Sequence, residues 1–363
     1  MKKNLLIGAA CLMTLSACTS EDVVDVSSTQ GNAIGFQNVV NKSTRAVDGD
    51  LDNNSFDNFL VYGYYVKPGM ATPIQIFNSV PVHKVDDPDR PGQKKWTYDG
   101  VRYWVPGCTY YFYAYSCADV ALANGNGTPY FSLFDATNPS VDNRALTISQ
   151  YLCDSNHQHD LVTAENEDIH ALESGNRDVS LAFTHALCKI KAVFSTDFPA
   201  DYQVYISNVY VSSFYNRADF NVGTGSWSGY TGTETNPYVM LNVPADSYVE
   251  NTTGSNLTTT EAFVIPKLYE TGKNENAKIH FSIVVKKDGQ AVLERNIVGT
   301  WSPQWNKGNI YQYSINISGS TAGIEPIVFA AEQSLSGNDS WDNSTRVDMV
   351  FGVDASENTA SVE

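Results

Sequence analysis

Residues 35–46 read GFQNVVNKSTRA, a short run of strand-forming residues followed at once by a polar segment that contains one arginine. Phe36, Val39 and Val40 favour a β-strand, and the Asn, Lys, Ser and Thr that follow end the pattern. A strand that precedes a protease-accessible arginine can be cut from the rest of the chain after folding. We therefore predict that this strand is removable and that its loss opens a groove for another copy of the protein.

The residues before this strand indicate export. Two lysines precede an apolar run, residues 5–15, that is too short to span a bilayer. The run ends in LSAC, which resembles a bacterial lipobox, so residues 1–17 are predicted to be a signal peptide and Cys18 the lipidated first residue. A plain secretory signal would also end in small residues. The acidic tether after Cys18 resembles the sequence that directs lipoproteins to the outer face of the membrane in Bacteroides-type bacteria. An ordinary solvated linker has the same composition.

The charge balance excludes several partners. The chain has 23 basic and 40 acidic residues and a formal net charge of −17, and removal of the leader lysines makes it more negative. Such an acidic chain is expected to be a poor ligand for nucleic acid and for anionic lipid. After the leader, no apolar run is long enough for a transmembrane helix.

Composition and patterning predict an all-β fold. The chain holds 21 tyrosines and 16 phenylalanines, and its apolar residues alternate instead of recurring every three or four positions. In residues 278–286, for example, Ile279, Phe281 and Ile283 share one face of the predicted strand. This strand is expected to pair with residues 290–298 across a turn at 287–289. Short strands separated by turns, in a chain of 363 residues, predict two β-sandwich domains in tandem.

Turn signals and one polar break set the predicted boundaries. Asp99-Gly100 predicts a hairpin between residues 96–98 and 101–104, because its tight turn needs positive φ angles. A polar break, ESGNRD at residues 173–178, is interpreted as the domain boundary. The predicted organisation is listed by residue range: a tether and removable strand over 18–45, an N-terminal sandwich over 46–178, a C-terminal sandwich over 179–322, and a C-terminal tail over 323–363.

Four further motifs carry a family resemblance. They are TRA (44–46) ahead of residues 59–64, RYWVPG (102–107) followed by residues 110–115, FTHAL (183–187), and WNKGNIY (305–311). In their order and spacing they resemble motifs of the fimbrillins, the subunits of Bacteroides-type (type V) pili. Together with the lipobox, the resemblance extends from Cys18 to about Trp341.

The resemblance implies a fold, a processing step and partners. It implies two tandem transthyretin-like β-sandwiches, export as an outer membrane lipoprotein, and cleavage between Arg45 and Ala46 by an arginine-specific surface protease. A strand from the next subunit would then fill the freed groove, so the partners would be other fimbrial subunits in a head-to-tail polymer. The protein would be a shaft or tip subunit that supports adhesion. An anchor subunit fits less well, because the arginine site is present.

The C-terminal tail is predicted to supply the donor strand. A donated strand completes the backbone ladder of the acceptor and inserts alternate side chains into it. Ile324, Ile327, Val328 and Phe329 form a first apolar segment, and residues 347–353 form a second. The first segment is equally compatible with a final strand of its own domain. The length of the tail leaves open which segment is donated.

Residues for catalysis or metal binding are few. The chain has no Gly-X-Ser-X-Gly elbow, phosphate loop or His-Glu-X-X-His, so we expect no enzyme, no cofactor and no metal. His157 and His159 are conceivable metal ligands, although a hydrated polar loop is the better interpretation. His185 is predicted to be a hydrogen-bonded structural residue. Beyond Cys11 and Cys18, the remaining cysteines are compatible with disulfides or with buried free thiols: Cys108, Cys117, Cys153 and Cys188.

Two other classes of function stay open on the sequence. A surface glycan-binding lipoprotein would use exposed, coplanar tyrosines and tryptophans as platforms for sugar rings. Cross-strand packing accounts for the same aromatic residues without a ligand. A β-sandwich hydrolase would need acidic residues clustered in a cleft, and the sequence shows no such cluster.

Overall fold

The computed structural model describes residues 32–40, 56–70, 72–117, 146–232, 238–252, 254–269, 276–318, 328–334 and 350–353. Side chains are described in these ranges except at residues 38–40, 328–334 and 350–353. Within the described ranges the secondary structure is β-strand and turn, with no helix, which confirms the all-β prediction. Accordingly, no helix long and apolar enough to cross a membrane is found in these residues.

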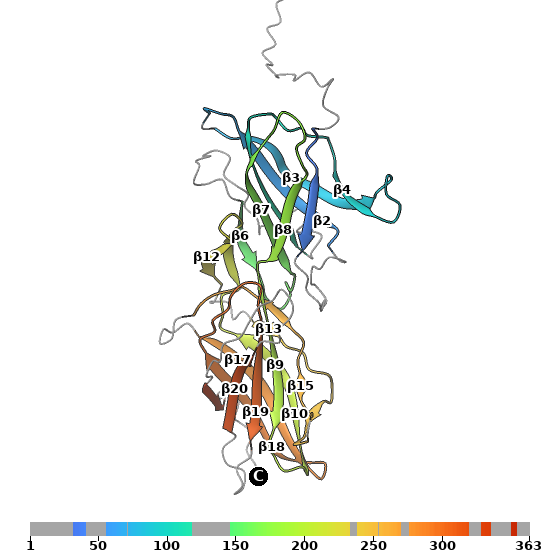
Figure 1. The fold of residues 1–363 in the computed structure, drawn as a ribbon. Coiled ribbons are helices and arrows are strands. Elements are labelled where there is room, and N and C mark those ends of the chain that lie inside the picture. Colours follow the sequence, from blue (N-terminus) through green and yellow to red (C-terminus); the bar gives the residue numbers. More distant parts are fainter. Residues whose placement is uncertain are drawn as a thin grey trace, which may run out of the picture.

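One large sheet forms one end of an elongated molecule, the upper end in Figure 1. Among the described residues it has seven strands, in the order β1-β8-β7-β5-β2-β3-β4. Their bounds in that order are β1 (Phe36–Val40), β8 (Val179–His185), β7 (Leu161–His170), β5 (Thr109–Cys117), β2 (Asn58–Val66), β3 (Ile74–Asp86) and β4 (Lys94–Tyr98). Its ladders are antiparallel except for the parallel pair of β1 and β8.

A small sheet of β6 (Thr147–Leu152), β11 (Arg217–Asn221) and β12 (Ser226–Thr231) shares a core with the large sheet. Tyrosines of β2 and β5, such as Tyr62 and Tyr115, belong to the same buried cluster as Ile148 and Phe220. The strands β11 and β12 are therefore distant from β2 and β5 in sequence but contribute to the same core.

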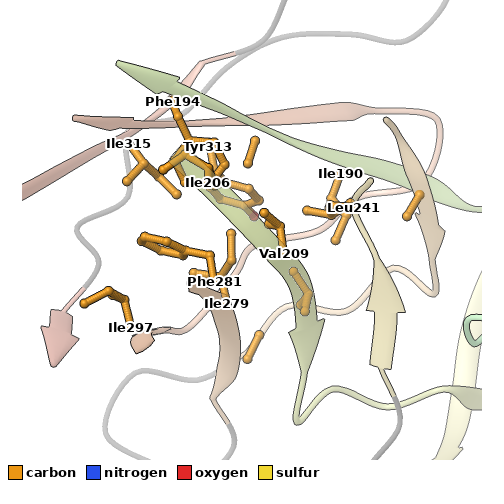
Figure 2. Close-up of a cluster of buried hydrophobic side chains, with 14 of the residues drawn as sticks. Ile190, Phe194, Ile206, Val209, Leu241, Ile279, Phe281, Ile297, Tyr313 and Ile315 are labelled. Atoms are coloured by element: carbon orange, nitrogen blue, oxygen red, sulfur yellow. The ribbon is translucent and has the colours of Figure 1, made fainter. Parts of the chain in front are cut away.

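Two sheets facing each other form the other end of the molecule. In the described residues one contains β15 (Leu257–Thr258), β9 (Cys188–Thr196), β19 (Ile310–Ser318), β20 (Val328–Ser334) and β16 (Ala262–Val264). The other contains β13 (Tyr238–Met240), β14 (Tyr248–Val249), β10 (Tyr202–Ser212), β17 (Ala277–Lys287), β18 (Gln290–Trp301) and β21 (Val350–Val353). Their inner faces meet in one hydrophobic core, in which Figure 2 shows Phe194, Phe281 and Ile315 converging.

Alternation along the strands accounts for this core. In β17, Ile279, Phe281 and Ile283 are buried while the residues between them are partly exposed, as the pattern predicted. The predicted pairing of β17 with β18 is also confirmed. The turn between them places Asp288 and Gly289 at φ angles of 48° and 78°, the left-handed pair that a tight hairpin requires.

The polar break at residues 173–178 connects β7 to β8, and these two strands pair within the same sheet. The chain changes sheets later, between β8 and β9. Turns within a sheet and linkers between domains are both polar and rich in glycine. Composition alone therefore does not distinguish them. Division of the chain into tandem folding units at residue 178 stays a prediction.

Trp305, the first residue of the WNKGNIY motif, shares a hydrogen-bond acceptor with Trp301. The indole Nε1 atoms of Trp305 and Trp301 donate to the Tyr313 hydroxyl at 2.8 and 3.3 Å, and all three side chains are buried. Removing that oxygen leaves two buried N–H groups without their acceptor.

We expect Tyr313→Phe to lower the free energy of unfolding by roughly 2–4 kcal/mol, because each orphaned donor costs about 1–3 kcal/mol. Urea denaturation followed by tryptophan fluorescence measures this loss. The control Tyr248→Phe removes a hydroxyl from a side chain that is 40% exposed, and it should change stability by less than about 0.5 kcal/mol. Equal effects of the two variants would contradict the assignment.

The four cysteines that follow Cys18 are buried free thiols in this structure. Burial raises the pKa of the Cys153 and Cys188 thiols, which disfavours the reactive thiolate. We expect the folded chain, without its first 18 residues, to leave Ellman's reagent almost unreacted at pH 8. All four thiols should react after unfolding in guanidinium. Rapid labelling of the folded protein would show that the cysteines are accessible.

Candidate interaction site at the amino-terminal edge strand

The predicted strand at residues 36–40 is confirmed as β1, the edge strand of the seven-stranded sheet. It pairs in parallel with β8, from Phe36 opposite Val179 to Val40 opposite Phe183. In the described part of the sheet, β1 has a ladder on this side alone. Removing this segment would break that one ladder and the hydrogen bonds between residues 32–34 and 102–104, whereas an interior strand would have to break two ladders.

The residues that lead into β1 are held from both sides. The Ile34 amide donates to the Arg102 carbonyl at 2.8 Å, and the Trp104 amide donates to the Asn32 carbonyl at 3.0 Å. On the opposite side, the Val179 amide donates to the Gly35 carbonyl at 2.8 Å. The chain therefore enters a groove whose walls are β8 and residues 102–104.

Alternate side chains of this segment point into the core. Ile34 and Phe36 are 2% and 5% exposed, whereas Gln37 is exposed. The Phe36 ring meets four aromatic rings edge-on, at centroid distances of 5.4 to 6.0 Å. These rings belong to Phe59, Phe77, Tyr98 and Phe112. Edge-to-face contacts of this kind add to the energy gained by burying the ring.

One polar contact fixes the segment against this aromatic floor. The Tyr98 hydroxyl donates to the Ile34 carbonyl at 2.6 Å. Burial raises the pKa of Tyr98, so its hydroxyl stays protonated and able to donate at neutral pH. The bond satisfies a backbone carbonyl beside the aromatic rings that surround Phe36.

Arg102 builds the wall of the groove that lies opposite β8. Its guanidinium lies over the Phe77 and Tyr98 rings, and Nε donates to the Ile76 carbonyl at 2.6 Å. Nη1 donates to the carbonyls of Asp99 and Gly100 at 3.1 and 2.7 Å. Arg102 of the RYWVPG motif thus has a structural role that was not predicted from the sequence. Its position next to an Asp-Gly turn is the sequence feature that could have indicated this role.

The predicted hairpin around Asp99-Gly100 is wrong in its pairing. Gly100 does adopt a positive φ of 73°, as a turn requires. However, β4 pairs with β3, and Tyr103 forms a bridge with Ala33. The hydrogen bonds of Arg102 account for this, because they turn the chain away from β4 and toward the amino-terminal segment.

The two described residues nearest to the predicted cleavage site lie close together in space. Val40 pairs with Phe183, and the Phe56 ring packs on the Phe183 ring at a centroid distance of 4.7 Å. Residues 41–55 therefore connect two points that both flank Phe183. Arg45 and Ala46 fall in that interval, which lies outside the described residues, as does the predicted lipidation site Cys18.

The predicted donor residues fall partly within the described chain. Ile324 and Ile327 lie outside it, whereas Val328 and Phe329 begin β20, which pairs antiparallel with β19. The second segment ends in β21, which pairs with β18. In the single chain the tail thus adds an edge strand to each of two facing sheets. For the first segment, this is the alternative left open on the sequence. Its role as a donor stays a prediction.

Two of the histidines, His185 and His157, pair with carboxylates. The prediction for His185 is confirmed, since its Nδ1 lies 2.8 Å from an Asp160 carboxylate oxygen in a fully buried pair. His157 Nδ1 lies 2.8 Å from an Asp154 oxygen. In the part of the chain that the structure describes, no three His, Cys, Asp or Glu residues gather in a group able to hold a metal.

Fold and site together define an all-β protein whose amino-terminal strand fills an aromatic groove at the edge of a sheet. The chain belongs to the fimbrillin-like family, whose family model matches residues 44–330. This membership supports a fimbrial or adhesin subunit at the cell surface that assembles with other fimbrial subunits. The family consists of structural proteins and not of known enzymes.

Several solved structures are similar to the chain at low identity. A candidate cell adhesion protein from Bacteroides uniformis is 18% identical, with a TM-score of 0.41 and coverage of 83% of this chain and 97% of that chain. The fimbrial anchor protein Mfa2 from Porphyromonas gingivalis is 9% identical, with a TM-score of 0.34 and coverage of 83% and 95%. A fimbrial assembly protein from Parabacteroides distasonis is 10% identical, with a TM-score of 0.38 and coverage of 83% and 96%. No curated protein matches the chain.

The contacts of Phe36 predict a large effect of its removal. We expect Phe36→Ala to lower the free energy of unfolding by about 3–5 kcal/mol, the usual cost of deleting a buried phenylalanine. The neighbouring exposed Gln37→Ala should cost less than about 0.5 kcal/mol. Urea denaturation of the uncleaved protein measures both. Similar values for the two variants would show that the ring does not fill the groove.

Proposed function

We propose that this protein is a shaft or tip subunit of a fimbria and that it polymerises by strand exchange after proteolysis. Cleavage between Arg45 and Ala46 by an arginine-specific surface protease would separate β1 from the sheet. The next subunit would then place a strand of its own in the vacated groove. The observation that supports this proposal best is the position of Phe36, buried among four rings in a strand that has a ladder on one side.

The energetics favour occupation of the groove by some strand. Without β1, the edge of β8 would present unpaired backbone groups beside an exposed aromatic floor, and both are costly in water. Burying side chains such as Ile34 and Phe36 contributes about 1.5–3 kcal/mol each. An incoming strand with apolar residues at alternate positions would restore both the backbone hydrogen bonds and the burial of apolar surface. Because such a contact joins two different surfaces head to tail, it continues into a filament.

The geometry around Phe183 is compatible with a cut that spares the rest of the fold. Val40 and Phe56 both flank this residue, so the interval that contains Arg45 leaves and rejoins the sheet at nearly the same place. Breaking the chain there removes no strand except β1 from the described sheet. The cleaved chain would keep the remaining six strands in their order.

The C-terminal tail is the proposed donor. β20 and β21 each pair with one neighbour among the described strands, so either can leave by breaking one ladder. Before processing, a lipid on Cys18 would hold the precursor at the outer membrane. Cleavage after Arg45 would release the chain from this anchor as it opens the groove, so that detachment and assembly follow from one cut.

The processing step is tested on purified, folded precursor. An arginine-specific protease should produce one new amino terminus at Ala46, measured by mass spectrometry and amino-terminal sequencing. Arg45→Ala should abolish this product. Arg90→Ala, which changes an exposed loop arginine, should leave it unchanged. A folded precursor that remains intact at Arg45 would contradict the proposal.

The donor role is tested on processed protein with a truncated tail. A chain that ends at Gly323 should form no ladder of polymers on an unheated, non-reducing gel, because it lacks both tail strands. It should stay monomeric by size-exclusion chromatography. A chain that ends at Ser334 keeps β20 but lacks β21, and therefore shows which strand is donated. Ladders that persist in the chain ending at Gly323 would exclude the tail as donor.

A further inference from the structure

The C-terminal tail repeats the pattern of the residues that fill the β1 groove. Ile34 and Phe36 occupy alternate positions there, and both are buried. Residues 327–329 read Ile-Val-Phe, so a strand formed by them would carry the same two side chains on one face. Residues 279–281 also have this pattern, but they belong to β17, which has ladders on both sides. Among the described strands β20 pairs with β19 alone, so the tail segment is the one that can leave by breaking a single ladder.

A proline before the tail triplet is compatible with the groove. With Ile327 in the place of Ile34, Pro326 takes the position of Ala33. The bridge that contains Ala33 uses the carbonyl of Asn32 and the amide of Ile34 as hydrogen-bonding groups, and not the amide of Ala33. Proline has no amide hydrogen, and therefore it removes no hydrogen bond at this position. It also favours an extended conformation in the residue before it, as entry into the groove requires.

The next position along the groove needs a hydrogen-bond acceptor. Asn176 Nδ2 donates to Asn32 Oδ1 at 2.6 Å. The tail residue at this position is Glu325, whose carboxylate oxygens are acceptors. The second tail segment, aligned by its Met-Val-Phe triplet at 349–351, places Val347 there, and valine cannot accept a hydrogen bond. The contact with Asn176 therefore favours the first tail segment over the second.

The direction and length of the connection limit where the acceptor can lie. β19 runs parallel to β9, which follows β8 along the chain and leads away from the seven-stranded sheet (Figure 1). The tail therefore leaves β19 after Ser318, at the end of the molecule remote from its own β1 groove. The eight residues 319–326 can span at most about 26–29 Å. A second copy would have to present its groove directly beside that end.

We propose that residues 325–330 of one copy enter the β1 groove of a second copy in a single register, with Phe329 in the place of Phe36. This assignment rests on the proposed strand exchange and identifies the segment that carries it. The Phe329 ring would pack among the four aromatic rings that surround Phe36 in the uncleaved chain. Ile327 would take the place of Ile34.

One side chain has to move to admit this donor. The Asp178 carboxylate lies where a Cβ atom on Gly35 would be. In the proposed register Val328 takes the position of Gly35, so the Asp178 side chain has to turn away. Because Asp178 is exposed, this rotation carries it into solvent. The native strand fits the groove without this change, which favours β1 over the donor until cleavage frees β1.

The register is tested by disulfide cross-linking in the chain from residue 19 onward. In the proposed register Ala330 takes the position of Gln37, which pairs with the exposed Ser180 of β8. We expect a chain with both Ala330→Cys and Ser180→Cys to form disulfides between processed subunits during oxidation with copper phenanthroline. The resulting ladder should survive heating in detergent and collapse on reduction. Within one chain residue 330 pairs with Asn316, in a different sheet from Ser180, so no disulfide should close inside a subunit.

Matched cysteine pairs control for geometry and for the competing register. Gln37→Cys with Ser180→Cys should form a disulfide within the uncleaved chain, because these residues are directly paired. Ala331→Cys with Ser180→Cys should not cross-link, because adjacent residues of a strand face opposite sides. Gly352→Cys with Ser180→Cys would cross-link if the second tail segment occupied the groove. Cross-links from residue 331 or 352, or polymers in which residue 330 forms none, would overturn the proposed register.

The aromatic contact is tested by substitution of the tail phenylalanines. Phe329→Ala should slow ladder formation by processed protein at least about tenfold, because it leaves the aromatic groove unfilled. Phe329→Leu should restore part of the rate, and the control Phe351→Ala should leave it unchanged. An unchanged rate with Phe329→Ala would contradict the register alone. If the processed chain without substitutions forms no ladder, strand exchange itself is wrong and the register fails with it.

Discussion

The seven-stranded sheet and its core depend on one aromatic interaction, the packing of Phe36 among four rings. These rings come from β2, β3, β4 and β5, so one side chain of the edge strand contacts most of the sheet. The contact of Phe36 with Tyr98 of β4 shows that the sheet is curled, since β1 and β4 lie at opposite ends of the strand order. The amino-terminal strand therefore closes the core, although it is bound along one edge.

The local features of this arrangement could be predicted, and the long-range ones could not. Phe36, Val39 and Val40 indicate a strand because β propensity is a property of a few neighbouring residues. The partner of that strand begins at Val179, and no local pattern encodes a pairing over such a distance. The failed hairpin at Asp99-Gly100 illustrates the same limit. The turn forms as its residues require. However, the hydrogen bond from the Arg102 side chain to the Ile76 carbonyl directs the following residues toward the amino-terminal segment instead of toward β4.

A similar distinction separates the groove from the surroundings of Lys189. The groove could be suspected from the sequence, because a strand lies next to a polar segment that contains an arginine. The burial of Lys189 has no such signature in the sequence. Lys189 itself would be taken for a solvent-exposed residue on an alternating strand. Its burial depends on the approach of β13 and β16, which only the tertiary structure brings together.

The parallel direction of β1 and β8 gives the groove a polarity. The first residues of β1 lie toward the end of the long axis that is opposite to β20 and β21 (Figure 1). A replacement strand that ran in the same direction would enter from that end. The body of the subunit that supplied it would then sit beyond the tip of the acceptor, and successive copies would stack coaxially. Under the proposed exchange, the orientation of one five-residue strand would favour a fibre over a closed ring.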